Sequence, residues 1–169
     1  PVAVKRLEEH KTERGGVMLG IDGNNAYQEA VRKLGAKKLI VQKMQSGLAE
    51  ATVGYRDDPV VGPLVLVGAG GVLAEVYRDA VLRVAPVSEE EAGEMIEQVK
   101  AFAAIRGFRN LPRGDVKALA RAVAAMSRLA LLEGRPVREA EVNPLIVKAG
   151  GVVAVDALVA LKATAQGTS

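Results

Sequence analysis

Cysteine and tryptophan are absent from this sequence of 169 residues, and histidine occurs only once. The lack of cysteine excludes disulfides, thiolate metal sites and cysteine nucleophiles, and it is compatible with a reducing cytosol. We therefore expect a cytoplasmic protein. Aromatic residues make up only 3% of the chain, which leaves few rings on which nucleobases could stack. We expect no nucleic acid among its partners.

Long hydrophobic runs are missing as well. No apolar segment approaches the roughly 20 residues that a membrane-spanning helix needs, and the N-terminal stretch PVAVKRLEEHKTERGG is too polar for a signal peptide. We expect no membrane partner. The formal net charge of +3 is a mild basic excess that would attract phosphorylated ligands. The sequence opens on a strand-like segment without an initiator Met, so we expect a fragment or a chain whose beginning is missing.

Residues 1–44 show a pattern of strands around one helix. A polar loop after the first strand ends in Gly15-Gly16. Asp22 offers a cap for a helix that runs to about Leu34 and is terminated by Gly35. The apolar runs that we interpret as strands cover residues 2–5, 17–21 and 39–44.

Residues 45–162 predict an antiparallel sheet and two helices. Ser88 and Glu91 form a capping box that opens a helix to about Ala104. Asp115 is expected to cap a second helix, which ends near Glu133. The extended runs, separated by turn residues, cover residues 51–55, 64–67, 72–77 and 81–84. Two last runs, 139–147 and 152–161, predict a hairpin, and residues 163–169 a frayed tail.

Strands in the middle of the chain with helices inserted late predict an α+β fold. The segment Gly68-Ala69-Gly70-Gly71 looks in part like a dinucleotide-binding loop. An extended run follows it, however, where the G-x-G-x-x-G fingerprint requires a helix. We therefore reject a Rossmann site.

The C-terminal hairpin carries three oxygen donors. Glu141 and Asn143 are two residues apart, so on a strand both side chains point to the same face. Asp156 lies on the partner run, near the position that faces them. Such a set would suit Mg²⁺, which binds one or two carboxylates together with substrate phosphates. A solvated strand face with Asn-Pro as a turn is an equally good interpretation of the spacing alone.

Two charged positions near the N-terminus are further candidates. Lys5 ends an apolar strand before the Gly15-Gly16 loop, where its ammonium could meet a phosphate, although a surface lysine is the commoner case. His10, the single histidine, lies in a charged loop. Its imidazole could act as a nucleophile or a base, or it could simply be solvated, and spacing does not choose between these.

Taken together, these segments resemble the ATP-grasp domain of acyl-CoA synthetases (NDP-forming), including the ADP-forming acetate–CoA ligases. The likeness covers nearly the whole chain in the family's order. Each motif is weak alone, but the ordered set is specific. The residues that carry it are 1–5, 10–13, 15–17, 41–44, 53–54, 56–63 (RDDPVVGP), 68–76 (GAGGVLAEV), 106–109 and 141–145 (EVNPL), with Glu50, Asp79, Arg83, Pro86 and Asp156.

The resemblance implies roles for single residues. Lys5 would contact the ATP phosphates, and the Gly15-Gly16 loop would close over them. Glu50 matches the acidic residue that binds the ribose hydroxyls, and Arg83 matches a basic residue placed to meet phosphate. The remaining matches are a hinge at the adenine edge with Gln42, Lys43 and Met44, magnesium ligands Asn143 and Asp156 with Glu141 beside them, and a phosphoryl-accepting His10.

The resemblance also implies the organisation and the activity. Residues 1–44 would form a partial first ATP-grasp lobe with the phosphate-binding loop, residues 45–162 the second lobe with the metal hairpin, and 163–169 a tail. The enzyme would join a carboxylic acid to coenzyme A at the expense of ATP, with Mg²⁺ and phosphoryl transfer through the histidine. A coenzyme A-binding domain or subunit would be its partner, and we expect an oligomer.

The sequence departs from the family in places. Lys43 stands where proline is common, Val61 stands where Phe is common, and the Ser-Pro that usually precedes the histidine is replaced by Leu7-Glu8-Glu9. Family members also carry a helix-containing segment ahead of the lysine strand. We therefore expect the isolated fragment to be inactive. The alternative is a non-catalytic nucleotide-sensing module, as found fused to acetyltransferases.

Overall fold

A six-stranded antiparallel sheet is the centre of the C-terminal part of the chain. The computed structural model describes residues 10–11, 17–18, 45–71, 79–110 and 112–162. By its internal contacts the chain divides into two units, Pro1–Met44 and Gln45–Ser169. The strands of the larger unit follow the order β5-β4-β3-β6-β7, with β8 also paired to β6. Their bounds are β3 Ala49–Asp58, β4 Gly62–Ala69, β5 Ala80–Val84, β6 Val137–Lys148, β7 Gly151–Ala154 and β8 Ala157–Leu161.

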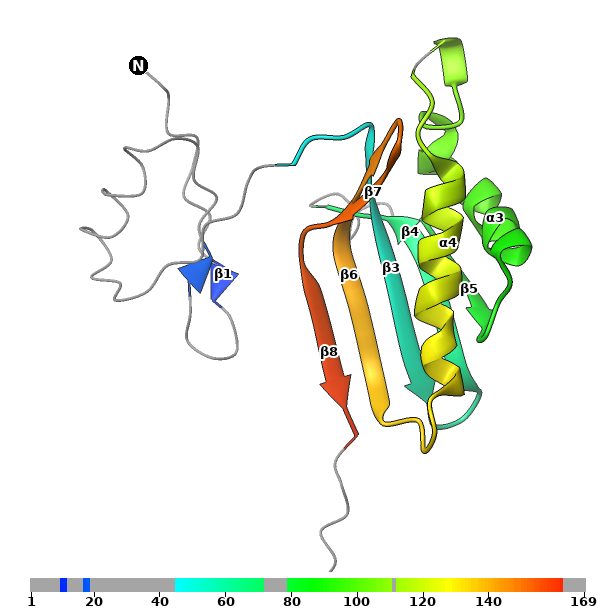
Figure 1. The fold of residues 1–169 in the computed structure, drawn as a ribbon, viewed down its shortest axis with the longest axis vertical. Helices are drawn as coiled ribbons and strands as arrows, with labels where there is room; N and C mark the ends of the chain where they lie inside the picture. The colour runs from blue at the N-terminus through cyan, green and yellow to red at the C-terminus, as the bar shows by residue number, and fades with distance from the viewer. Residues whose placement is uncertain (1–9, 12–16, 19–44, 72–78, 111, 163–169) are drawn as a thin grey trace, which may run out of the picture. The chain divides into compact units, whose positions relative to one another are not determined.

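Buried and more exposed residues alternate along the strands, so the sheet has one buried face and one more exposed face. On β3, Ala51, Val53 and Tyr55 are buried, whereas the residues between them point to the opposite face. The buried face carries the hydrophobic core, into which the two helices α3 (Glu89–Gln98) and α4 (Val116–Ser127) pack. Figure 1 shows α4 lying along the central strands and α3 beside it. The other face of the sheet is therefore the one on which polar groups can meet a ligand.

Both helices begin where the sequence predicts. Ser88 and Glu91 form the capping box of α3 in both directions, and the Asp115 carboxylate accepts a hydrogen bond from the N–H of Ala118 at the start of α4. These signals are local, since the cap and the group it satisfies lie three residues apart. The start of each helix is thus fixed by its own sequence.

Both helices end earlier than predicted. Helix α3 stops at Gln98 and is followed by the 3₁₀ turn η1 (Lys100–Ala103), where the Asp79 carboxylate accepts from the N–H of Ala101 at 2.7 Å. Helix α4 stops at Ser127, whose buried hydroxyl accepts from the N–H of Val87 at 3.0 Å. Its continuation is the 3₁₀ turn η3 (Arg128–Leu131), and another short turn, η2 (Phe108–Asn110), lies between the helices. The residues bonded at these helix ends, Asp79 and Val87, come from distant parts of the chain. The helical pattern of the sequence therefore does not predict where the helices end.

The C-terminal run predicted as one strand is divided into β7 and β8. Both pair with β6 in antiparallel register, and the break falls at Val155 and Asp156. Opposite the break, β6 carries one more residue than β3, because Ala51 faces Leu145 and Val53 faces Val142. This irregularity contains Asn143, and bulges of this kind redirect side chains near functional sites.

The smaller unit is described only in part. Strands β1 (His10–Lys11) and β2 (Val17–Met18) form a two-stranded antiparallel ladder, with His10 opposite Met18. The other elements expected before residue 45, and the strand expected at 72–77, lie outside the described residues. Within the part of the chain that the structure describes, no helix is long and apolar enough to cross a membrane.

Candidate functional site

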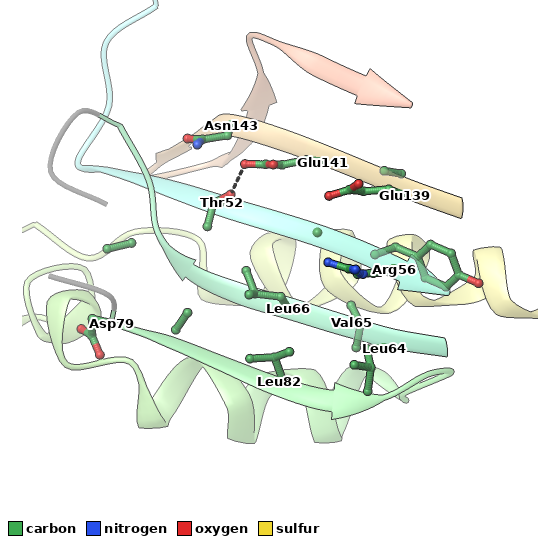
Figure 2. Close-up of a pocket in the computed structure, with 15 residues that line it drawn as sticks. Thr52, Arg56, Leu64, Val65, Leu66, Asp79, Leu82, Glu139, Glu141 and Asn143 are labelled. Atoms are coloured by element: carbon green, nitrogen blue, oxygen red, sulfur yellow. Dashed lines mark hydrogen bonds between the residues drawn. The ribbon is translucent and has the colours of Figure 1, made fainter. Parts of the chain in front are cut away.

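A groove of about 490 Å³ lies on the face of the sheet opposite the helices. Figure 2 shows its walls: β6 on one side, β3 beneath, and β4 with β5 on the other side. The β6 wall is polar, and the β4–β5 wall is mostly apolar. The side chains used below are Thr52, Arg56, Leu64, Leu66, Leu82, Glu139, Glu141 and Asn143.

Glu141 and Asn143 both line the polar wall, together with Glu139 (Figure 2). Glu141 is half-buried, and its Oε1 accepts a hydrogen bond from the hydroxyl of Thr52 at 3.1 Å. The neighbouring strand therefore holds this carboxylate, and its other oxygen remains available for a ligand. The structure brings these two predicted residues to one groove.

Asp156 lies directly across the hairpin from Asn143. The N–H of Asn143 donates to the carbonyl of Asp156 at 3.2 Å, and the N–H of Val155 donates to the carbonyl of Pro144 at 3.1 Å. The backbone positions thus face each other, as the spacing suggested. The Asp156 side chain is exposed, and its Oδ1 accepts from the N–H of Ala157 at 2.8 Å.

A glycine turn after β4 joins Asn143 to Glu50. The N–H of Gly71 donates to the side-chain oxygen Oδ1 of Asn143 at 3.2 Å, and the N–H of Gly70 donates to the carbonyl of Glu50 at 2.9 Å. Glu50 lies near the start of β3 with an exposed side chain. Strands β3 and β6, with the turn after β4, therefore place Glu50, Asn143 and Glu141 in the same region of the sheet.

Arg83 does not join this group. It pairs with Val65, whose side chain belongs to the core, so Arg83 points to the helix-covered face of the edge strand β5. Its guanidinium donates to the carbonyl of Leu82 at 3.2 Å. The pKa of Glu91 at the start of α3 is lowered mainly by hydrogen bonds from Ser88, and the charge of Arg83 contributes a smaller effect. Arg83 thus lies on the α3 side of the sheet.

The other predicted site residues fall in the smaller unit. The backbone of His10 belongs to β1, and nothing further is described for it. The predicted nucleotide-binding residues Lys5, Gly15, Gly16, Gln42, Lys43 and Met44 lie outside the described residues. Their assigned roles stay predictions.

The sequence did not single out Thr52, Arg56, Glu139 or Gly71 as site residues. Arg56 faces Glu139 in the register of β3 and β6 and forms no ion pair with any residue that the structure describes. The available signal was the alternation that places every second residue of β3 and β6 on the same face as Glu141. That signal needs the register between the strands, which the sequence does not provide.

The predicted donors Glu141, Asn143 and Asp156 are two carboxylates and one amide, the ligand types that Mg²⁺ takes alongside substrate phosphates. Glu141 and Asn143 line the groove, whereas Asp156 is not among its lining residues. Among the described residues, no group of three or more His, Cys, Asp or Glu side chains could hold a metal ion. A cation here would therefore depend on the Asn143 oxygen and on ligands supplied by a substrate.

Known proteins are similar to this chain in sequence. Residues 1–161 match the family model described as ATP-grasp domain. The ADP-forming acetate–CoA ligase I of Archaeoglobus fulgidus is 35% identical over 92% of this chain and 24% of its own length. The beta subunit of the ADP-forming acetate–CoA ligase I of Pyrococcus furiosus is 32% identical over 93% of this chain and 73% of the subunit.

A solved structure of a related enzyme is also similar to this chain. Acetyl-coenzyme A synthetase 1 of Ca. Korarchaeum cryptofilum, in complex with coenzyme A and Mg-AMPPCP, superposes with a TM-score of 0.76. Its identity to this chain is 34%, over 90% of this chain and 71% of that one. Its phosphohistidine segment points towards the nucleotide-binding site.

The fold and the sequence match together define an ATP-grasp domain of α+β architecture. Within that family the chain belongs to the beta-subunit-like portion of the ADP-forming acetyl-CoA synthetases. The fold and the family expected from the sequence are thereby confirmed. The chain spans about a quarter of the length of the single-chain ligase, so other parts complete that enzyme.

Proposed function

We propose that this chain is the nucleotide-binding part of an ADP-forming acid–CoA ligase, and that ATP binds at the end of the groove where Glu50, Glu141 and Asn143 meet. The observation that carries the proposal is this convergence, since the two strands β3 and β6 and the Gly70–Gly71 turn bring the three residues to one region of the sheet. The Mg-nucleotide complex of the relative from Ca. Korarchaeum cryptofilum supports it.

Within this site, the oxygens of Asn143 and Asp156, with Glu141 beside them, would hold Mg²⁺. When bound, Mg²⁺ neutralises charge on the phosphates. Glu50 would accept hydrogen bonds from the ribose hydroxyls. Lys5 with Gly15 and Gly16 would bind phosphates, and residues 42–44 would contact adenine. A phosphate contact of Arg83 stays a prediction, and that side chain lies on the opposite face of the sheet.

His10 would act as the phosphoryl acceptor. Its imidazole nitrogen attacks the γ-phosphorus of ATP, a P–N bond forms, and the P–O bond to ADP breaks. A carboxylate oxygen of the acid then takes the phosphoryl group from the histidine and forms an acyl phosphate. The thiol of coenzyme A attacks the acyl carbon, and inorganic phosphate leaves. These last steps would take place on a partner domain or subunit that binds coenzyme A.

The chain alone is expected to bind Mg-ATP without making acyl-CoA. Because the single-chain relative is about four times longer, the acid and coenzyme A would meet this site only in the complete assembly. The assembly would be an oligomer in the cytoplasm.

The proposal is tested by removing the two assigned metal ligands. Asn143→Ala combined with Asp156→Ala should abolish the rise in melting temperature that Mg-ATP gives the intact protein, because two direct ligands are lost. Glu133→Ala is a control that removes the same net charge from an exposed position away from the groove. A double variant that Mg-ATP still stabilises as it does the wild type would refute the metal assignment.

A further inference from the structure

The Gly70–Gly71 turn contacts two groups that belong to different strands. Gly71 donates its N–H to Oδ1 of Asn143, which extends from β6 into the groove (Figure 2). Gly70 donates its N–H to the carbonyl of Glu50 on β3. The turn therefore lies between the residue assigned to the ribose and the residue assigned to the metal.

A side chain at either position of the turn would meet another group, which is fixed backbone at Gly70 and the end of the exposed Glu50 side chain at Gly71. A Cβ on Gly70 would lie 2.5 Å from the carbonyl carbon of Ala51 and 2.6 Å from its oxygen, which are backbone atoms that cannot yield. A Cβ on Gly71 would overlap with Oε2 of Glu50 and lie 3.0 Å from its Cδ. Gly71 also has a φ of +74°, in the left-handed region. The Glu50 carboxylate thus occupies the space that the bare α-carbon leaves.

The hydrogen bond to Asn143 selects one orientation of its amide. With Oδ1 accepting from Gly71, the second lone pair of that oxygen remains free for a cation. A half-turn of the amide would present the NH₂ group instead, which repels a cation, and would leave the Gly71 N–H without this acceptor. The backbone of the turn therefore favours the orientation in which Asn143 can bind metal.

We propose that Gly71 is a positioning residue that fixes the Glu50 carboxylate and the Asn143 amide relative to each other. The N–H of Gly71 orients the amide oxygen of Asn143. Because Gly71 has no side chain, the Glu50 carboxylate can lie beside its α-carbon. This inference rests on the proposed function, because that function assigns Glu50 to the nucleotide and Asn143 to Mg²⁺.

The test compares Gly71→Ala with Gly62→Ala in the 169-residue chain. Gly62 has a φ of +85°, and a Cβ there would meet nothing within 4 Å, so this variant carries the backbone strain without the collision. Gly71→Ala should raise the Kd for Mg-ADP about tenfold, because the carboxylate is displaced. Gly62→Ala should leave that Kd within about twofold of the wild-type value. The measurement is calorimetric titration with ADP, with and without Mg²⁺.

A double variant shows whether displacement of Glu50 causes the loss of Mg-ADP affinity in Gly71→Ala. Glu50→Ala removes the group with which the new methyl would collide, so Gly71→Ala in that background should cost less than about twofold further affinity. The melting temperature gives a second readout. Truncating Glu50 should return the melting temperature of Gly71→Ala to the level of Gly62→Ala, since only the strain then remains.

The outcomes separate the two proposals. Unchanged Mg-ADP binding in Gly71→Ala, an equal loss in Gly62→Ala, or an effect that adds fully to that of Glu50→Ala would overturn the positioning role. A failure of the melting temperature to recover in the double variant would overturn it too. If the wild-type chain binds no Mg-nucleotide, the proposed function fails, and the melting comparison still decides whether Gly71 makes the place for Glu50.

Discussion

Single hydrogen bonds hold the polar wall of the groove in position. Thr52 holds Glu141 from β3, and Gly71 holds Asn143 from the turn after β4. Each bond uses one lone pair of an oxygen and leaves others directed elsewhere. The acidic and amide groups of β6 are therefore oriented before any ligand arrives, which reduces the ordering that binding has to supply.

Thr52→Val tests this orientation at one residue. Valine keeps the shape of threonine but cannot donate to Glu141, so the carboxylate is freer to turn away. We expect Mg-ADP affinity to fall by about fivefold, which corresponds to roughly 1 kcal/mol, the usual value of one hydrogen bond. Thr52→Ser, which keeps the hydroxyl, should bind nearly as the wild type does. Equal losses in the two variants, measured by titration, would show that the hydroxyl is not the cause.

At the scale of elements, capping hydrogen bonds decide where each of the two long helices begins. The capping box of α3 lowers the pKa of Glu91 mainly because the backbone N–H of Ser88 donates to the Glu91 carboxylate at 2.7 Å, with the Ser88 side chain as the next cause. A carboxyl group whose pKa is lowered by folding stabilises the fold above its ordinary pKa. The stabilisation disappears as the pH falls through the lowered value.

Glu91→Gln tests this pH dependence. Glutamine keeps the hydrogen bond to the N–H of Ser88 but carries no charge near the positive end of the helix. The variant should be less stable than the wild type at neutral pH, and the difference should shrink as the pH falls below the ordinary glutamate pKa and through the lowered one, where Glu91 becomes protonated in both states. Urea unfolding between pH 2 and pH 7 measures it. Glu94→Gln removes the same charge farther along α3, and a matching trend there would contradict the role of the cap.

The same elements show what the sequence can and cannot predict. The helix starts at Ser88 and Asp115 were predictable, because each cap satisfies a group three residues away. The position of Asp156 opposite Asn143 followed from hairpin spacing. The irregularity of β6 arises from its pairing with β3, and the face of Arg83 is decided by its partner Val65. Both depend on contacts between distant segments, so no local pattern carries them.

At the scale of the whole molecule, the described sheet supplies only part of the proposed chemistry. The groove offers carboxylates, an amide and a guanidinium, and no histidine is among the residues that line it. His10 lies in the smaller unit, and its assignment comes from the resemblance of its motif. The relatives include both a single-chain ligase and a separate beta subunit, so the same domain works in two chain arrangements.

His10→Ala in the complete assembly tests whether this unit carries the phosphoryl group. The variant should lose acyl-CoA formation by at least about a thousandfold, because no other group replaces the nucleophile. Its affinity for Mg-ATP should stay within about twofold of the wild type, since every residue that lines the groove is unchanged. Incubation with γ-labelled ATP adds a direct readout: the wild-type chain should take up acid-labile, base-stable label, and the variant should take up none. Turnover that persists without His10, or label that appears in its absence, would assign the transfer to a different acceptor and leave this chain a nucleotide-binding component only.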